Sequence, residues 1–308
     1  MYRKILVPLD GSKLAESALP FALSLAERSG GELHLIRVVT MVPPYAPFED
    51  SGVGNDRWLE DFRTASSKYL QEIRERIRQA GSDIASQAHV LSGRPVRAIH
   101  RHILEKSIDQ VVMTTHGRGR LQRMWLGSVA DGVVRSVPAP VFLWRGDEEG
   151  GVDLTARPSH RRILVPLDGS EMARAILPWA EELARLFEAQ LFLVGVIPQE
   201  VGFDSPYIPH AAEEEAKRDS QRDELEAHLA RAAEGIGRRG MEVSHGVVSA
   251  PSAHDGIMSE QERIGADVVA LSTRGRDPGT RLLLGSVADK VIRGSEVHVL
   301  VHRDTEEN

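Results

Sequence analysis

One sequence pattern occurs twice in this chain, in a constant register. The run RKILVPLDGS ends at Ser12 and RRILVPLDGS ends at Ser170, so Asp10 corresponds to Asp168, a displacement of 158 residues. A second pattern, a threonine followed by a glycine turn and then LGSVAD, recurs at the same displacement in residues 115–131 and 273–289. Solenoid repeats have periods of roughly 20 to 50 residues, so a period this long predicts two whole domains, each with its own core.

The length of 308 residues agrees with that division. A domain of about 150 residues buries roughly 68 to 70% of the surface of its unfolded chain, which is enough for an independent core. We expect a first domain at residues 1–145, a linker rich in Asp, Glu and Gly at 146–158, a second domain at 159–303 and a tail at 304–308.

Composition excludes several classes of protein. The net charge is −7 with acidic and basic residues interspersed, which provides no basic surface for nucleic acid or an anionic membrane. The chain has no cysteine, so disulfides, thiolate metal sites and thiol nucleophiles are excluded. The apolar stretch in residues 1–10 is too short for a signal peptide or a membrane span, and we expect a cytoplasmic protein.

The twelve histidines show no metal-binding motif. His100 and His102 are two residues apart on a predicted helix and so point to different faces, and no HExxH pattern occurs. We therefore predict scattered surface histidines and no metal site.

Apolar periodicity predicts alternating strands and helices in the first half. Ser12 is the expected N-cap of the first helix, and the pair Gly30-Gly31 is expected to end it. Alternation of this kind predicts a doubly wound α/β domain, with a parallel sheet covered by helices on both faces. The expected strands are 5–9, 33–39, 84–91, 110–114 and 140–144, and the expected helices are 14–28, 58–79, 95–105 and 128–135, with the same order in the second half.

The segments after the second strands, 42–55 and 198–209, correspond least well between the halves. Each contains a proline-tyrosine pair, Pro44-Tyr45 and Pro206-Tyr207. We expect solvated surface connections here, with loops that fold over a ligand as the alternative.

Ligands of open parallel sheets bind at the carboxyl ends of the strands, where two repeated elements of this chain fall. Asp10 ends the first strand, and its carboxylate could accept hydrogen bonds from a ribose or simply turn the chain. Residues 117–128 join the fourth strand to a helix, whose free amides and positive dipole end suit a phosphate. Ser128 could cap that helix or donate to the phosphate. The loop arginines could clamp phosphates or stay solvated: Arg118, Arg120, Arg123, Arg274, Arg276 and Arg281.

Two familiar nucleotide motifs are absent. Gly117-Arg118-Gly119 lacks the third glycine of a dinucleotide fingerprint and follows the fourth strand instead of the first. No Gly-x4-Gly-Lys-Ser/Thr stretch occurs, so this is not a P-loop hydrolase.

With the strand-end Asp10, the run from Thr115 through Gly127-Ser128 and the closing strand at 140–144, each half resembles a universal stress protein domain, and the chain resembles a tandem member of that family. The resemblance covers about residues 1–145 and 159–303. It implies two five-stranded, doubly wound parallel sheets of order 3-2-1-4-5, a Rossmann-like fold of the adenine nucleotide alpha hydrolase type. It also implies that the fifth strands, 141–144 and 297–301, pair within one chain as a pseudo-dimer, with a homodimer of two chains as a further possibility.

The resemblance further implies ATP, with or without Mg²⁺, as the cofactor. The family loop G-x2-G-x9-G-Ser/Thr matches this sequence except at its first glycine, where Thr114 and Ser272 stand. The implied contacts are to base and ribose from the strand ends and to phosphate from the loop and helix. In the first half they are Leu9, Asp10, Val38, Thr114, Gly117, Gly127, Ser128 and Val129; in the second, Leu167, Asp168, Val196, Ser272, Gly275, Gly285, Ser286 and Val287.

Three functions are compatible with the sequence. The leading hypothesis is an ATP-binding regulator of the stress response, not an enzyme beyond weak ATP hydrolysis, because no general base is evident near the γ-phosphate. The alternative is a nucleotide-free scaffold or small-ligand-binding stress protein, which the loss of the first motif glycine favours. An ATP-dependent transferase or hydrolase is the third, by fold analogy alone.

Overall fold

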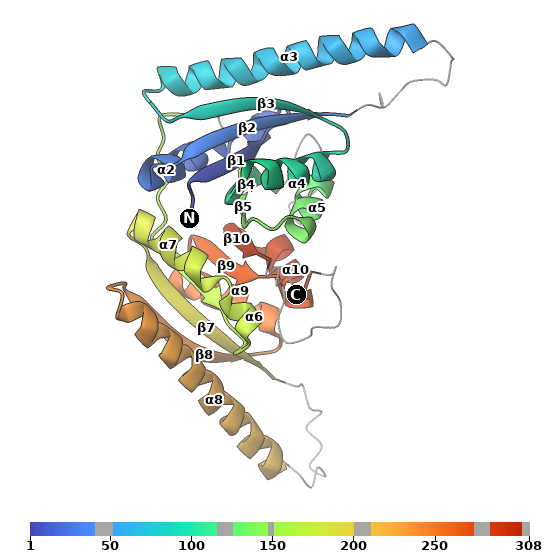
Figure 1. Cartoon of the computed structure of the whole chain (residues 1–308). Coiled ribbons are helices and arrows are strands. Elements are labelled where there is room, and N and C mark those ends of the chain that lie inside the picture. The colour runs from blue at the N-terminus through green and yellow to red at the C-terminus, as the bar shows by residue number, and fades with distance from the viewer. Residues whose placement is uncertain (41–51, 116–125, 147–150, 200–210, 274–283, 304–308) are drawn as a thin grey trace. The chain divides into compact units, whose positions relative to one another are not determined.

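The computed structural model of the chain describes residues 1–40, 52–115, 126–146, 151–199, 211–273 and 284–303, with the side chains of 52–57 and 211–214 left out (Figure 1). The described residues form two compact units, Met1–Pro158 and Ser159–Asn308. We describe each unit by itself.

The first unit contains a five-stranded sheet in which every pair of neighbouring strands is parallel. Its order, β3-β2-β1-β4-β5, confirms the predicted doubly wound arrangement. The strands are β1 (Lys4–Pro8), β2 (Glu32–Val39), β3 (Ser86–Ser92), β4 (Gln110–Thr114) and β5 (Val141–Trp144).

Helices cover both faces of this sheet (Figure 1). Those that follow β1 and β2 lie on one face, and those that follow β3 and β4 lie on the other, as right-handed crossovers require when the strand order reverses. They are α1 (Lys13–Glu16), α2 (Leu19–Ser29), α3 (Gly52–Gln79), α4 (Pro95–Lys106) and α5 (Ser128–Ser136).

The prediction of one continuous first helix was wrong. The structure ends α1 at Glu16 and begins α2 at Leu19, with Pro20 in the first turn of α2. Proline has no N–H to donate and its ring excludes the carbonyl four residues earlier, so a helix restarts there. The predicted cap is confirmed, because the Ser12 hydroxyl accepts from the Ala15 amide at 3.1 Å. Gly30 ends α2 in a left-handed conformation, φ 61°.

The second unit repeats the first: its order, β8-β7-β6-β9-β10, is again 3-2-1-4-5 when β6 is counted as its first strand. All its described strand pairs are parallel. Its strands are β6 (Arg162–Pro166), β7 (Gln190–Pro198), β8 (Val243–Ala250), β9 (Val268–Ser272) and β10 (His298–His302), and its helices are α6 (Glu171–Arg174), α7 (Leu177–Phe187), α8 (Ala211–Gly237), α9 (Ala253–Ile264) and α10 (Ser286–Gly294).

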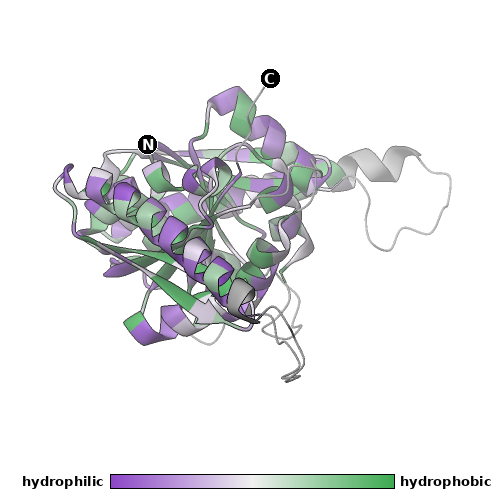
Figure 2. Ribbon diagram, turned by 90° about the horizontal axis from the view of Figure 1, so that it is seen from below, coloured by the Kyte–Doolittle hydropathy of each residue, from purple (hydrophilic) through white to green (hydrophobic). Residues whose placement is uncertain are grey.

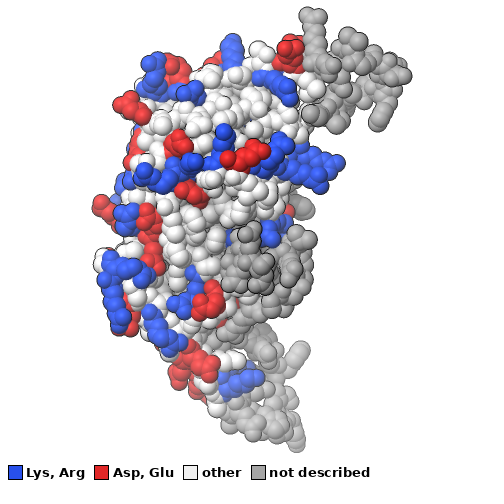
Figure 3. Space-filling model, viewed as in Figure 1, with Lys and Arg blue, Asp and Glu red and all other residues white. Residues whose placement is uncertain are grey.

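The core of each unit lies between its sheet and the covering helices. Figure 2 shows apolar residues concentrated on the strands and mixed with polar ones along the helices. In the first unit, Phe21 of α2 is fully buried and stacks on Phe142 of β5 with ring centroids 4.0 Å apart. Acidic and basic side chains are interspersed over the described surface in Figure 3. No helix in the described part of the chain is long and apolar enough to span a membrane.

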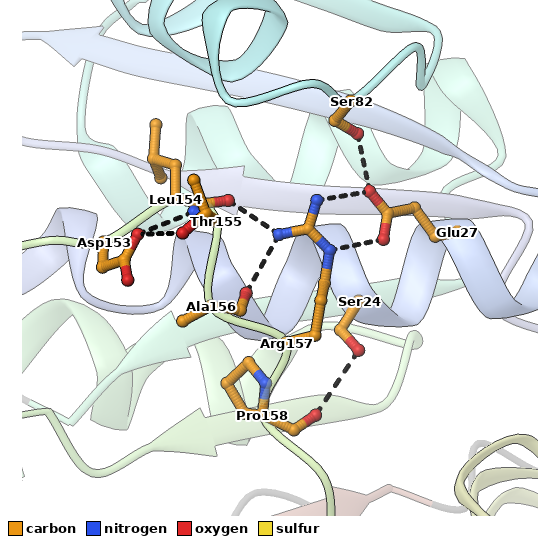
Figure 4. Close-up of polar contacts among 9 residues, drawn as sticks. All are labelled: Ser24, Glu27, Ser82, Asp153, Leu154, Thr155, Ala156, Arg157 and Pro158. Carbon is orange, nitrogen blue, oxygen red and sulfur yellow. Dashed lines mark hydrogen bonds and ion pairs between the residues drawn. The ribbon is translucent and has the colours of Figure 1, made fainter.

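The end of the predicted linker is attached to the first unit (Figure 4). Arg157 makes a bidentate ion pair with Glu27 of α2, with N–O distances of 2.5 and 2.8 Å, and also donates to the carbonyl oxygen of Leu154. Burial by itself would raise the pKa of Glu27, but hydrogen bonds from Arg157 and Ser82 bring it below its usual range. Leu154 is buried, so residues 153–158 are part of the packed unit.

We expect Arg157→Ala to release this segment without unfolding the unit. A well-formed bidentate pair is worth roughly 1 kcal/mol even when partly exposed, so the segment should open about 5-fold more often. Limited proteolysis at residues 153–158 should accelerate by that factor. Arg185→Ala, which removes an exposed pair with Glu182 in the second unit, is the matched control and should leave the cleavage rate unchanged.

Candidate functional site

The structure places the predicted base and ribose contacts at one edge of each sheet. Val38 lies at the carboxyl end of β2, paired with Leu91, and Asp10 lies just beyond the end of β1. The pairing of Leu6 with Val111, carried forward along both strands, brings Asp10 level with Thr115, directly after β4. Helices that leave β1 and β4 cover opposite faces, so the crevice between these strand ends is the switch point where doubly wound sheets bind ligands.

The Asp10 carboxylate shapes the turn after β1. Its Oδ1 accepts from the Ser12 amide at 2.9 Å, and Gly11 has a φ of 86°, which only glycine adopts without strain. The same turn recurs in the second unit, where Asp168 accepts from the amide and the hydroxyl of Ser170 at 2.9 and 2.6 Å. The turn-forming role is therefore present in both units, and it fixes each carboxylate at the edge of the crevice.

The remaining predicted contacts to the base come from the same edge. Leu9 is buried and its amide donates to the Ile36 carbonyl oxygen of β2 at 2.8 Å. Leu167 makes the corresponding bond to Val194 at 2.8 Å, and Val196 is paired with Val248 near the end of β7. The walls of both crevices are thus built alike.

The predicted phosphate seat is the N-terminus of α5. Gly127 is its N-cap residue, and the Gly127 amide donates to the Thr115 carbonyl oxygen at 2.7 Å, which ties the helix start to the end of β4. The first intrahelical bond is donated by Asp131, so the amides of Ser128, Val129 and Ala130 have no partner among the described residues. Three N–H groups at the positive end of a helix dipole can bind an anion.

The second unit has the same helix start. The Gly285 amide donates to the Thr273 carbonyl oxygen at 2.7 Å, and Asp289 donates the first intrahelical bond. The amides of Ser286, Val287 and Ala288 are left without a partner among the described residues. Val287, the second residue of α10, is 37% exposed.

The amides of Gly127 and Gly285 are already bonded within the protein and are therefore not donors to a ligand in this conformation. Their function is to hold the helix start in place. Of the two alternatives for Ser128, capping does not occur: Ser128 is the first helical residue, it is exposed, and no side chain caps α5. Its hydroxyl is therefore available to a ligand.

The two units differ where the first motif glycine is replaced. Thr114 and Ser272 are the last residues of β4 and β9, and both are buried. The Ser272 hydroxyl has no hydrogen-bond partner among the described residues. The second crevice thus contains a buried hydroxyl that a ligand could satisfy.

Several predicted residues lie outside the described residues. They are Gly117, Gly275, the arginines 118, 120, 123, 274, 276 and 281, and both proline-tyrosine pairs. Their predicted contacts stay predictions.

Three features were missed from the sequence, and two of them follow the carboxyl ends of strands. Arg145 follows β5, is half-buried and donates to the Thr115 hydroxyl at 3.5 Å; burial lowers its pKa. Glu16 of α1 is buried, and it accepts from Tyr69 and Arg76 at 3.0 and 2.7 Å. Arginine recurs at positions 145 and 303, which are 158 residues apart, and this repeat could have drawn attention to Arg145. No local pattern indicates the second, because its partners lie more than 50 residues away.

The third missed feature is a group of three histidines. His34, His89 and His102 come from β2, β3 and α4 and lie together, with ring centroids between 4.8 and 6.0 Å apart. His34 and His102 are buried, so the prediction that the histidines are scattered over the surface was wrong for these residues.

Comparison with known proteins gives a consistent result. The model of the universal stress protein family matches residues 1–145 and 159–303. The universal stress protein Rv2005c of Mycobacterium tuberculosis is 25% identical over 307 residues, with 98% of this chain and 97% of that protein covered. MJ0531 of Methanocaldococcus jannaschii, also a universal stress protein, is 29% identical over 146 residues, which is 46% of this chain and 82% of that protein.

The fold also matches solved structures over the whole chain. The crystal structure of a universal stress protein from Archaeoglobus fulgidus covers 97% of this chain and 98% of its own, with a TM-score of 0.69 and 23% identity. At this identity the likeness shows the fold alone.

Proposed function

The chain belongs to the universal stress protein family as a tandem member, and we propose that each of its units binds ATP and that nucleotide occupancy regulates a stress response. The observation that carries the proposal is the duplicated helix start, at which three amides of α5, and three of α10, have no partner among the described residues. A triphosphate supplies the negative charge and the acceptor oxygens that these groups require.

The proposal gives a role to the predicted contacts that lie in the described residues. The phosphates lie against the amides of residues 128–130, with the Ser128 hydroxyl as a further donor. The sugar lies beside Asp10, whose carboxylate is held at the strand end by the Ser12 amide and accepts from a ribose hydroxyl. The base lies against Leu9 and Val38 at the ends of β1 and β2. Asp168, Ser286, Leu167 and Val196 take the same roles in the second unit.

Hydrolysis in these sites is slow or negligible. Catalysis of phosphoryl transfer to water needs a group that orients or deprotonates the water next to the γ-phosphate. The carboxylate at the edge of each crevice, Asp10 or Asp168, is fixed at the sugar end by its turn. We therefore propose a nucleotide-binding regulator with at most a weak ATPase activity, with Mg²⁺ bound only through the phosphates.

The test is to denature the purified protein, identify the released small molecules by mass spectrometry, and then titrate the nucleotide-free chain with ATP by calorimetry. We expect up to two adenine nucleotides per chain. A chain that is purified without nucleotide and gives no heat with millimolar ATP would contradict the proposal.

The second candidate is a nucleotide-free scaffold or a small-ligand-binding stress protein. Buried Thr114, in place of the first motif glycine, favours this function for the first unit, because its side chain takes up space at the strand end. If the chain binds one nucleotide, and Ser286→Pro abolishes this binding whereas Ser128→Pro does not, only the second unit binds nucleotide. The first unit would then have this second function.

Pairing of the fifth strands within one chain also stays a prediction, as does a homodimer. A fused pair of domains would cover two exposed sheet edges independently of protein concentration. Sedimentation of the full chain over a range of concentrations distinguishes a monomer from a dimer.

A further inference from the structure

We propose that His34, His89 and His102 form a binding site for a divalent transition metal ion, of which Zn²⁺ is the best match. One ring nitrogen of each histidine lies within 4.8 Å of those of the other two. Tetrahedral zinc with Zn–N bonds of about 2.0 to 2.1 Å holds its nitrogens roughly 3.3 Å apart. Side-chain rotations that move the ring nitrogens by about 1 Å would bring them to this distance.

The hydrogen bonding of these histidines supports a missing ligand. Nδ1 of His34 and Nε2 of His89 and of His102 are buried and lack a hydrogen-bond partner among the described residues. A buried polar atom without a partner costs about 1 to 3 kcal/mol, and three of them in one cluster are rare in native proteins. A metal ion would satisfy all three together.

Glu32 holds the proton of His34 on Nε2, which leaves Nδ1 as the nitrogen that can bind a metal. Its Oε1 lies 3.1 Å from Nε2 of His34, and a carboxylate can only accept, so Nε2 carries a proton and Nδ1 is the nitrogen left to bind a metal. A carboxylate bonded to the outer nitrogen of a histidine is the usual second partner in zinc sites.

The backbone explains why the three side chains meet. His89 is paired with Ile36, which is two residues from His34 on the same face of β2. That face carries α4, whereas Arg37 on the opposite face lies 5.0 Å from the Tyr69 ring of α3. His89 is partly exposed on β3, the edge strand, which leaves a path for an ion to enter.

The second unit provides an internal comparison. Leu6 pairs with His34, and its counterpart Leu164 pairs with Phe192. The positions that correspond to His89 and His102 are Gly246 and Glu260. The same fold therefore forms without these histidines, so their presence in the first unit is not a requirement of its packing.

The test uses the full chain without a histidine tag, stripped with a chelator and titrated with ZnCl₂ by calorimetry. We expect one high-affinity Zn²⁺ per chain and a higher melting temperature with Zn²⁺ present. His34→Phe, which takes the residue of the second unit, and His89→Ala or His102→Ala should each abolish this binding. Glu32→Gln should weaken it about 10-fold or more.

The matched control is His100→Ala, which removes a histidine from the same helix and should leave Zn²⁺ binding unchanged. Circular dichroism of each metal-free variant establishes that it is folded. Failure of the wild-type chain to bind Zn²⁺, or undiminished binding by folded His89→Ala and His102→Ala, would overturn the proposal. None of these results depends on ATP.

Discussion

Replacing Ser128 and Ser286 together with proline is expected to weaken ATP binding by at least about 100-fold while both units stay folded. Each substitution removes one hydroxyl and one backbone N–H from a phosphate seat. A hydrogen bond to a charged group is worth roughly 1.5 to 3 kcal/mol, and 1.4 kcal/mol corresponds to about a factor of ten in affinity. The loss of two such bonds per site gives the expected effect.

The helices should tolerate this change because each serine is the first helical residue. Proline is favoured at that position, where its missing N–H has no intrahelical acceptor. The residue before a proline is restricted to extended conformations, and Gly127 already has φ −59° and ψ 146°. Gly285, with φ −56° and ψ 144°, fits equally well.

The matched control is Ser128→Ala with Ser286→Ala, which removes only the hydroxyls. We expect a loss of about 10-fold, so the difference between the two double variants measures the amides. Calorimetric titration with ATP gives both values, and unchanged circular dichroism and melting temperature verify the fold. If the proline variant binds ATP as tightly as the wild type, the phosphates do not lie at these helix ends.

Phe21→Ala is expected to cost the first unit roughly 3 to 5 kcal/mol of stability, the largest effect on folding that the structure predicts. Phe21 is fully buried and stacks on Phe142 and Trp144, with centroids 4.0 and 5.5 Å away. Truncation leaves a cavity between α2 and β5 and removes the ring contacts. Both effects lower the stability further than the loss of apolar burial alone.

Hydrogen exchange read by mass spectrometry tests this in each unit separately. Amides of β1 and β4 should lose protection in the variant, whereas those of β6 and β9 should change less. Leu104→Ala is the control, because Leu104 is 59% exposed and its truncation should change stability by about 0.5 kcal/mol or less. Protection of β1 and β4 that is no weaker than in the control would contradict the assignment of Phe21 to the core.

Much of the architecture could be predicted from local sequence. The helix at Pro95–Lys106 and the strand at Gln110–Thr114 were correct to within one residue, because proline and apolar runs mark their bounds directly. The break before Leu19 was missed although Pro20 marks it, since the apolar spacing continues through the break. The exact 158-residue displacement, together with the parallel crossovers, led correctly to two sheets of the same order.

The candidate nucleotide site could be proposed from the sequence because its parts lie in contiguous motifs, and its ligand stays a prediction. Asp10 and the segment at Gly127-Ser128 are each recognisable in a few residues, and their meeting follows from the strand order. The individual roles were not predictable. That the Gly127 amide is already bonded to Thr115, and that Ser128 is exposed and does not cap, depends on the path of the backbone between two elements.

The sequence by itself therefore determined the duplication, the alternation of strands and helices, and the edge of each sheet at which a ligand site is proposed. These properties depend on periodicity and on the handedness of short crossovers, which neighbouring residues specify. Only the tertiary structure decided which amides stay free, how the linker is attached through Arg157, and that His34, His89 and His102 meet. Those features join residues from separate elements, and their distances are fixed only when the sheet and the helices pack together.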